Sequence, residues 1–156
     1  MAKTLVAYFS ATGTTARAAK AVATELGADL REIAPAVPYK ADDLNWNNRR
    51  SRSTAEMEDP SARPELAEQP GDLSAYDTVL VGFPIWWYVA PRIVETWVEA
   101  ASSQLAGKRV VTFATSGGSG MGRTTAELAK LAPAATWQNG EVLRGERAAQ
   151  GWAASL

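Results

Sequence analysis

The stretch LVAYFSATGTT, residues 5–15, begins with five apolar residues and ends in a turn rich in hydroxyl groups. Apolar character at every position, rather than at alternate ones, is typical of a strand buried on both faces of a parallel sheet. The apolar spacing then becomes helical over residues 14–26 and stops at Gly27. The segment therefore predicts a strand, a tight turn and a helix.

Strands and helices continue to alternate along the rest of the chain. Alternation of this kind implies parallel strands joined by right-handed crossovers. We therefore expect a single α/β domain over residues 1–156, with a doubly wound five-stranded parallel sheet and helices on both faces. The polar segment 34–76 is longer than an ordinary connection, which favours a functional role. The predicted strands after the first cover 30–33, 78–83, 109–114 and 134–138, and the later helices cover 47–58, 91–106, 122–131 and 146–155.

The composition limits the possible chemistry. The chain has 156 residues, a net charge of −1, no cysteine and no histidine. Disulfides, thiol catalysis, a Ser-His-Asp triad and histidine-ligated metals are therefore excluded, and any redox chemistry must come from a cofactor. The small net charge gives no general attraction to nucleic acid or to an anionic membrane. No apolar run reaches the roughly 20 residues of a membrane span, and the first is too short for a signal peptide, so we expect a cytoplasmic protein.

The turn at residues 10–15 has the features of an anion site. A helix N-terminus offers unpaired N–H groups and a partial positive charge, both suited to a phosphate. Glycine allows close backbone approach, and the hydroxyl groups add donors, although no lysine or arginine lies in the turn. An ordinary helix-capping turn is the alternative explanation. The candidate phosphate-binding residues are Ser10, Thr12, Gly13, Thr14 and Thr15.

Three loops together resemble those of flavodoxin-like proteins. Residues 10–15, SATGTT, are similar to the phosphate loop of that family, and residues 84–87, PIWW, and 115–120, TSGGSG, are similar to its two flavin loops. Each loop follows a predicted strand in the family's order, and the similarity extends over essentially the whole chain. The resemblance implies noncovalently bound FMN and the strand order 2-1-3-4-5, of which flavodoxin itself is the standard example.

The resemblance also assigns roles to the residues of the two flavin loops. We expect Trp86 or Trp87 to contact the flavin, because two adjacent tryptophans in a loop cannot both point into one core; core packing is the alternative for each. Tyr88 either caps the ring edge or faces a substrate. Many family members place glycine just after the stacking aromatic residue, but here Tyr88 follows, for which a positive φ costs about 1 kcal/mol or more. The ring-contact residues are Pro84, Ile85, Trp86 and Trp87, and the ring-edge residues are Ser116, Gly117, Gly118 and Gly120.

The predicted function is electron transfer through FMN, either to a protein partner or to a small molecule such as a quinone. The flavin carries the chemistry, so the prediction includes no catalytic side chain and no metal and favours an FMN-dependent oxidoreductase or electron-transfer flavoprotein. The sequence leaves the choice between carrier and reductase open, together with the oligomeric state. The alternative is a nonredox phosphate-binding or regulatory module on the same fold, which would need the first loop but not the aromatic one.

The long crossover contains a basic cluster, Arg49, Arg50 and Arg52, with acidic residues close by. Such a cluster is most often a solvated helix face, and its functional alternative is a contact with an electron donor or a substrate. Trp46 in the same segment either packs under the crossover or covers the site.

Overall fold

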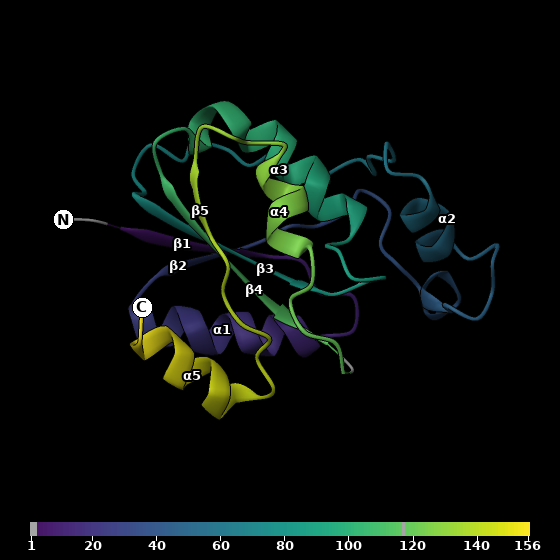
Figure 1. The fold of residues 1–156 in the computed structure, drawn as a ribbon, viewed down its shortest axis with the longest axis horizontal. Coiled ribbons are helices and arrows are strands. Elements are labelled where there is room, and N and C mark those ends of the chain that lie inside the picture. The colour runs from purple at the N-terminus through teal and green to yellow at the C-terminus, as the bar shows by residue number, and fades with distance from the viewer. Residues whose placement is uncertain (1–2, 117) are drawn as a thin grey trace.

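Five strands form one parallel sheet in the computed structural model, which describes residues 3–116 and 118–156 (Figure 1). The order across the sheet is β2-β1-β3-β4-β5, and every neighbouring pair is parallel. The expected fold class and strand order are thus confirmed. The strands are β1 (Thr4–Tyr8), β2 (Asp29–Glu32), β3 (Thr78–Pro84), β4 (Arg109–Thr115) and β5 (Thr136–Gln138).

Helices cover both faces of the sheet, as expected. Helices α1 (Thr14–Leu26) and α5 (Glu146–Ala154) lie side by side on one face, whereas α3 (Arg92–Leu105) and α4 (Thr124–Ala129) cover the other (Figure 1). Successive strand residues point to opposite faces, so the core has two halves. Val6 belongs to the half under α1 and α5, and its two neighbours in β1 belong to the half under α3 and α4. Covering both faces explains why the first strand is apolar at consecutive positions.

One position in the centre of the sheet requires glycine. Gly82 of β3 pairs with Phe113 of β4, and a Cβ atom on Gly82 would lie 2.2 Å from the Phe113 ring. The ring occupies this space and packs against Trp152 of α5, with the ring centroids 5.6 Å apart. Gly82 therefore allows a phenylalanine to join the sheet to one of its covering helices.

The crossover between β2 and β3 contains η1 (Ala41–Leu44), a short 3-10 helix, and α2 (Arg52–Glu58). Figure 1 shows α2 set apart from the sheet, at the right of the view, beyond the end at which the strands finish. The prediction of a helix over residues 47–58 is therefore wrong for its first part, because α2 begins only at Arg52.

The residues before α2 form turns because their asparagine side chains compete for backbone hydrogen bonds. The Asn45 side chain accepts from the N–H of Asn47 at 3.1 Å, and the Asn48 side chain accepts from the N–H of Arg50 at 2.9 Å. Ser51 then provides the N-cap of the helix with its own side chain. The helix starts where a favourable cap follows the turns.

The other predicted elements agree with the structure to within two residues at each end. The largest difference is α4, which is shorter than the predicted helix 122–131 because Gly122 has a left-handed backbone, with φ +56°. Strand β5 has only three residues. Over the described part of the chain, no helix combines the length and the apolar character needed to cross a bilayer.

The sheet order places a candidate crevice at one edge of the molecule. β1 lies between β2 and β3, so the loops that follow β1 and β3 leave neighbouring strands. The helices after them cover opposite faces of the sheet, since α1 and α3 lie on different sides (Figure 1). Ligands of open α/β sheets bind where the connections diverge in this way.

Candidate functional site

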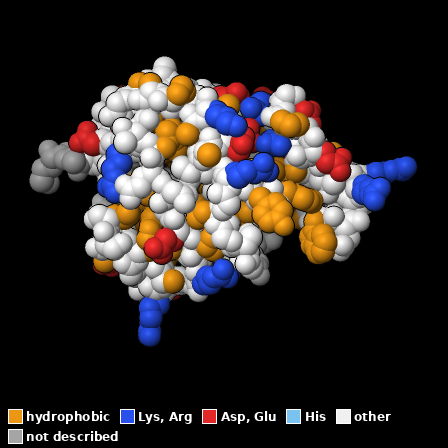
Figure 2. Space-filling model, viewed as in Figure 1, with side chains coloured by type: hydrophobic (Ala, Val, Ile, Leu, Met, Phe, Trp, Pro, Cys, Tyr) orange, Lys and Arg blue, Asp and Glu red, His pale blue; other side chains and the backbone are white. Residues whose placement is uncertain are grey.

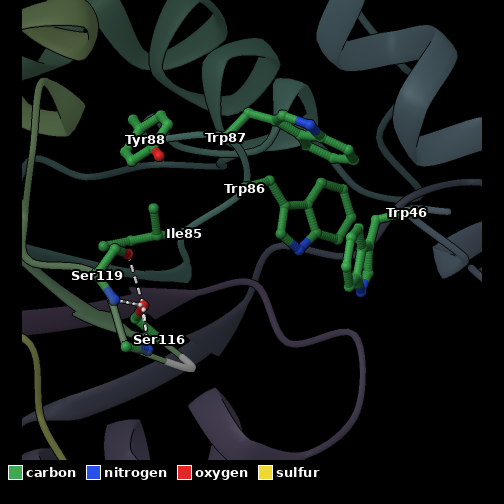
Figure 3. A pocket seen from close by; sticks show the side chains of 8 residues that line it. Trp46, Ile85, Trp86, Trp87, Tyr88, Ser116 and Ser119 are labelled. Carbon is green, nitrogen blue, oxygen red and sulfur yellow. Dashed lines mark hydrogen bonds between the residues drawn. The ribbon is translucent and has the colours of Figure 1, made fainter.

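A cavity of about 510 Å³ opens at the carboxyl end of the sheet, where the loops after β3 and β4 meet the crossover. Figure 2 shows hydrophobic side chains gathered in the hollow between α2 and the sheet. The cavity has the size and the largely apolar character of a small-molecule or cofactor site. Its lining consists of Trp46, Ile85, Trp86, Trp87, Tyr88, Ser116, Gly118 and Ser119, which are drawn as sticks in Figure 3.

Trp86 forms the inner wall of this cavity and is held from behind by two other aromatic rings. Its ring meets those of Phe9 and Tyr39 edge to face, with centroids 5.7 and 5.5 Å apart. The Tyr39 hydroxyl donates a hydrogen bond to the Glu56 carboxylate. Burial raises the pKa of Tyr39, and this hydrogen bond raises it further, so the hydroxyl keeps its proton and remains a donor. Trp86 is thus supported by a packed cluster that reaches to α2.

Trp87 and Tyr88 form the tip of a tight two-residue turn. The turn is closed by two backbone hydrogen bonds between Trp86 and Val89, at 3.0 and 3.2 Å. Both tip residues have positive φ, 50° at Trp87 and 70° at Tyr88, a conformation that such turns usually give to glycine or asparagine. The cost is roughly 1–2 kcal/mol per residue. The sequence analysis gives this cost for Tyr88, and in the structure it arises at two successive positions.

The loop after β4 holds the strained turn in place. Gly122 lies so close to the turn that a Cβ atom on it would be 2.9 Å from the carbonyl oxygen of Tyr88. The next residue, Arg123, donates its backbone N–H to the same oxygen at 3.3 Å. The carbonyl of a strained residue is therefore hydrogen-bonded by a second loop, so the two loops that line the cavity form one unit.

The floor of the cavity is a serine turn between β4 and α4. The Ser116 hydroxyl accepts from the N–H of Gly118 at 3.2 Å and from the N–H of Ser119 at 2.9 Å. The two serine hydroxyls are 2.6 Å apart, and the dashed lines in Figure 3 mark this pair. The turn presents compact polar groups opposite the aromatic wall.

The loop after β1 leads into α1 and leaves the N-terminus of that helix accessible. Gly13 has φ 94° and precedes α1 without a side-chain cap among the described residues, while its own N–H donates to the Ser10 hydroxyl at 3.0 Å. Thr12 and Thr14 are exposed. Arg17 is also exposed, and its guanidinium lies 3.7 Å from where a Cβ atom on Gly13 would be. The first amides of α1, two hydroxyls and one cation thus surround an accessible helix N-terminus.

Thr15 has a different environment from the other threonines of this loop. It is 1% exposed, and its hydroxyl lies 2.6 Å from the hydroxyl of Thr115 at the end of β4. Each hydroxyl can act as donor or acceptor, so the pair satisfies both groups where little water reaches. Thr15 therefore links the first loop to the strand that leads into the serine turn.

The structure brings most of the expected flavin-loop residues together, but not all of them. Pro84 ends β3 in register with Thr115 and is not among the residues that line the cavity. Gly120 is exposed and outside the lining, and Gly117 lies outside the described residues. The candidate phosphate residues 10–15 lie on the neighbouring strand's loop, also outside the lining. The expected residues in the lining are Ile85, Trp86, Trp87, Tyr88, Ser116 and Gly118.

Three further residues belong to this region although the expected set lacks them. Ser119 lines the cavity, and its spacing of three from Ser116 is a recognisable turn signal. Gly122 supports the strained turn, which no local pattern indicates. Trp46 lines the cavity from the crossover, 40 residues before Trp86, and the sequence alone left its place open.

The basic cluster of the crossover is divided between two environments. Arg52 pairs with Glu56 at 3.0 Å and lies over the Tyr39 ring, 3.8 Å from its centroid. It therefore supports the aromatic cluster as well as facing solvent. Arg49 and Arg50 are exposed, as expected, but they lie in the turn before α2 rather than on a helix face.

Comparisons with a family model and with solved structures point to the same family. The family model described as "Flavodoxin" matches residues 3–154. A crystal structure of a candidate flavoprotein from Bacteroides eggerthii DSM 20697 is 49% identical, with a TM-score of 0.90, over 99% of this chain and 98% of that chain. A second candidate flavoprotein, from Bacteroides uniformis ATCC 8492, is 47% identical, with a TM-score of 0.91, over 97% of each chain.

A more distant structure shares the fold and was solved with a ligand. It is a flavoprotein in complex with FMN from Lactobacillus acidophilus NCFM, 21% identical, with a TM-score of 0.75 over 97% of this chain and 99% of that chain. No match was found among curated proteins.

Proposed function

The chain belongs to the flavodoxin family, and from this premise we propose that it is a single-domain protein that binds FMN noncovalently and uses it for electron transfer. The proposal rests on one observation above all. Three loops that are far apart in the sequence meet at the carboxyl end of one sheet, and they combine an open helix N-terminus with an aromatic cavity. This combination suits a ligand that has a phosphate at one end and a flat ring at the other.

The loop after β1 would hold the phosphate. The unpaired amides of α1 carry the positive end of the helix dipole, worth roughly half an elementary charge. Thr12 and Thr14 can donate hydroxyl hydrogen bonds, and Arg17 adds a full charge nearby. Thr15 would serve indirectly, because its hydroxyl already has a partner in Thr115.

The cavity would hold the ring. Trp86 offers a rigid face because Phe9 and Tyr39 support it, and Trp87 is 43% exposed at the turn tip. Stacking on such a ring is worth about 0.5–1.5 kcal/mol beyond the buried area. The serine turn supplies hydroxyl and amide groups for the polar edge of the ring, and FMN itself would supply the redox chemistry when bound.

The family relatives support the same ligand. The Lactobacillus acidophilus protein with this fold was solved in complex with FMN, and two much closer relatives are described as candidate flavoproteins. The absence of cysteine and histidine from the sequence favours noncovalent binding, since those side chains commonly carry covalent flavin links.

Titration of the purified apoprotein with FMN tests the proposal. We expect quenching of FMN fluorescence at equimolar protein, a shifted visible spectrum, and release of FMN on denaturation, identified by mass. Riboflavin, which lacks the phosphate, should bind more weakly because it leaves the α1 amides without a partner. A folded chain that binds inorganic phosphate but leaves FMN fluorescence unchanged would instead be a nonredox phosphate-binding module.

A further inference from the structure

Tyr39 belongs to a compact group of side chains that the proposed function uses only as a support for Trp86. Its hydroxyl donates to the Glu56 carboxylate, and Glu56 pairs with Arg52 at 3.0 Å. The Arg52 guanidinium lies 3.8 Å from the centroid of the Tyr39 ring, and the Glu56 side chain is only 13% exposed. A phenol, the carboxylate that accepts its hydrogen bond and a balancing cation therefore lie together, largely out of water.

The ring of Tyr39 contacts a tryptophan that lines the aromatic cavity. Its centroid is 5.5 Å from that of Trp86, and Phe9 contacts both rings, at 5.5 and 5.7 Å. Trp46 and Trp87, which are 71% and 43% exposed, line the same cavity (Figure 3). An oxidising radical that enters the cavity from solution therefore meets tryptophan rings first, and the inner one of these rings contacts Tyr39.

Tyr39 also lines a second, smaller cavity of about 150 Å³, together with Ser10, Pro35 and Pro38. None of the described residues that line this cavity also lines the aromatic one. The contact between Tyr39 and Trp86 thus joins two different hollows of the molecule, and a small solute can approach Tyr39 without passing the tryptophans.

We propose that Trp86, Tyr39 and Glu56 form a proton-coupled relay that repairs the tryptophan wall after one-electron oxidation. Once Trp86 has lost an electron to an oxidising radical, it takes one from Tyr39, and the hydroxyl proton of Tyr39 moves to the Glu56 carboxylate. Trp86 is restored, and the products are a neutral tyrosyl radical and a carboxylic acid. This activity is separate from electron transfer by a flavin and does not require one.

The relay returns to its starting state with one electron from solution. A soluble one-electron donor of the enediol class, such as ascorbate, reduces the tyrosyl radical at Tyr39 and becomes a radical itself. Glu56 returns the proton to the phenolic oxygen. The net result is that the oxidising radical has been reduced by the enediol, while each side chain keeps its original form.

The charges around the ring couple the movement of the electron to that of the proton. A cation is attracted to the face of a neutral aromatic ring but repels positive charge placed on that ring. Arg52 therefore disfavours a radical cation at Tyr39, so the electron leaves only if the proton leaves as well. Glu56 already accepts the hydrogen bond, which is the geometry that a proton acceptor needs. Burial and this hydrogen bond raise the pKa of Tyr39, as does the charge of Asp43, so the resting hydroxyl holds its proton.

A second tyrosine in the chain has the same kind of partners without the tryptophan. The Tyr76 hydroxyl donates to the Asp29 carboxylate at 2.6 Å, and the Arg31 guanidinium lies 5.5 Å from the centroid of its ring. Among the described residues, however, Tyr76 has no ring contact with a tryptophan. Tyr76 is therefore the matched control, since it has a proton acceptor but no adjacent indole that could take its electron.

Pulse radiolysis of the full chain in azide solution tests the relay. Azide radicals oxidise tryptophan in preference to tyrosine, and indolyl and tyrosyl radicals absorb at different wavelengths. In the wild-type chain we expect the tyrosyl signal to grow as the indolyl signal decays, at a rate independent of protein concentration, and ascorbate to shorten the life of the tyrosyl radical. Tyr39→Phe keeps the packed ring and should remove most of the tyrosyl signal, whereas Tyr76→Phe should leave it unchanged.

Glu56→Gln tests the proton step. The amide still accepts a hydrogen bond but is a far weaker proton acceptor than a carboxylate. The transfer should slow by about 100-fold, the lower end of what a positioned proton acceptor contributes to a rate. The wild-type transfer should also be slower in deuterium oxide, because a proton moves with the electron. Urea denaturation establishes that each variant is folded; if Glu56→Gln is not, Tyr39→Phe and the isotope effect still decide.

Three results would overturn the inference. A tyrosyl signal that survives in Tyr39→Phe would place the radical at another tyrosine, such as Tyr88 beside Trp87. An equal wild-type rate in light and heavy water, or an unchanged rate in Glu56→Gln, would remove Glu56 as the proton acceptor. The test needs no flavin, so a chain that fails to bind FMN would remove the proposed function and leave this inference to be judged on its own.

Discussion

The loop after β1 and the turn after β3 reach unusual backbone conformations by opposite means. In the first, the positive φ falls on Gly13, which adopts it without steric cost. In the second, it falls on Trp87 and Tyr88, at roughly 1–2 kcal/mol each. The first loop is a local structure, whereas the second depends on Gly122 and Arg123 from another loop. The difference teaches that the conformation of the candidate anion loop is encoded locally, whereas that of the aromatic turn depends on the assembled fold.

The largest expected effect comes from disturbing the contact of Gly122 with the turn at Trp87 and Tyr88. Gly122→Ala places a methyl group 2.9 Å from the Tyr88 carbonyl at a residue whose φ is +56°. We expect at least about a tenfold loss of FMN affinity, because the turn must move. Isothermal titration of FMN measures the change.

Gly27→Ala is the matched control for this substitution. Gly27 has a similar φ of +62°, but a Cβ atom there meets nothing within 4 Å. The control should lose about 1 kcal/mol of stability and keep its FMN affinity. Equal FMN affinities in the two variants would show that the contact with Tyr88 does not support the site.

The next largest effect is a loss of stability when the hydroxyl pair between Thr15 and Thr115 is broken. Thr15→Val keeps the shape of the side chain but leaves the buried Thr115 hydroxyl without its partner. The free energy of unfolding should fall by about 1–3 kcal/mol, measured by urea denaturation of the apoprotein. Thr24→Val on the exposed side of the same helix should change it by less than about 0.5 kcal/mol.

A smaller effect is expected at the exposed part of the first loop. Thr12→Ala should weaken FMN about fivefold through loss of one hydroxyl donor, without changing the stability of the apoprotein. The FMN titration is compared with that of riboflavin, for which the substitution should have no effect. A similar loss for both ligands would place Thr12 away from the phosphate.

The smallest effect is a gain in stability. Tyr88→Asn replaces a strained aromatic residue with one that tolerates a positive φ, so the apoprotein should gain about 0.5 kcal/mol in urea denaturation. Ala90→Asn at a buried site two residues later should destabilise instead. No gain at Tyr88 would mean that its side-chain contacts outweigh the backbone strain.

Much of the fold could be predicted because its signals are local. Continuous apolar runs mark the central strands, and helical spacing with a glycine stop marks α1 to the residue. The prediction failed over residues 47–51, where asparagine side chains take backbone hydrogen bonds that a helix would need. This competition is one reason for the low helix propensity of asparagine, and the predicted helix start at residue 47 did not take it into account.

The loops of the candidate site could be predicted from the sequence, but the residues from other segments that contact those loops could not. Ile85, Trp86 and Ser116 follow strands, so sheet topology alone brings them together. Gly122 and Trp46 act through contacts with residues far away in the chain, and no local pattern contains such contacts. Their roles depend on how the connections cross the edge of the sheet.

The buried arginine under α2 has a consequence for how such a protein can diversify. Arg92 donates to the carbonyls of Glu56 and Met57, and Arg52 donates to that of Val37, so neither contact involves the turn at residues 45–50. Asn45 and Asn48 shape that turn, and we expect its other residues to tolerate substitution without a change in the sheet. The exposed residues of the turn can therefore vary while the anchored parts of the crossover keep their positions. Varying the exposed residues of this turn, Trp46 among them, would change the rim of the cavity while the anchored segments stay the same.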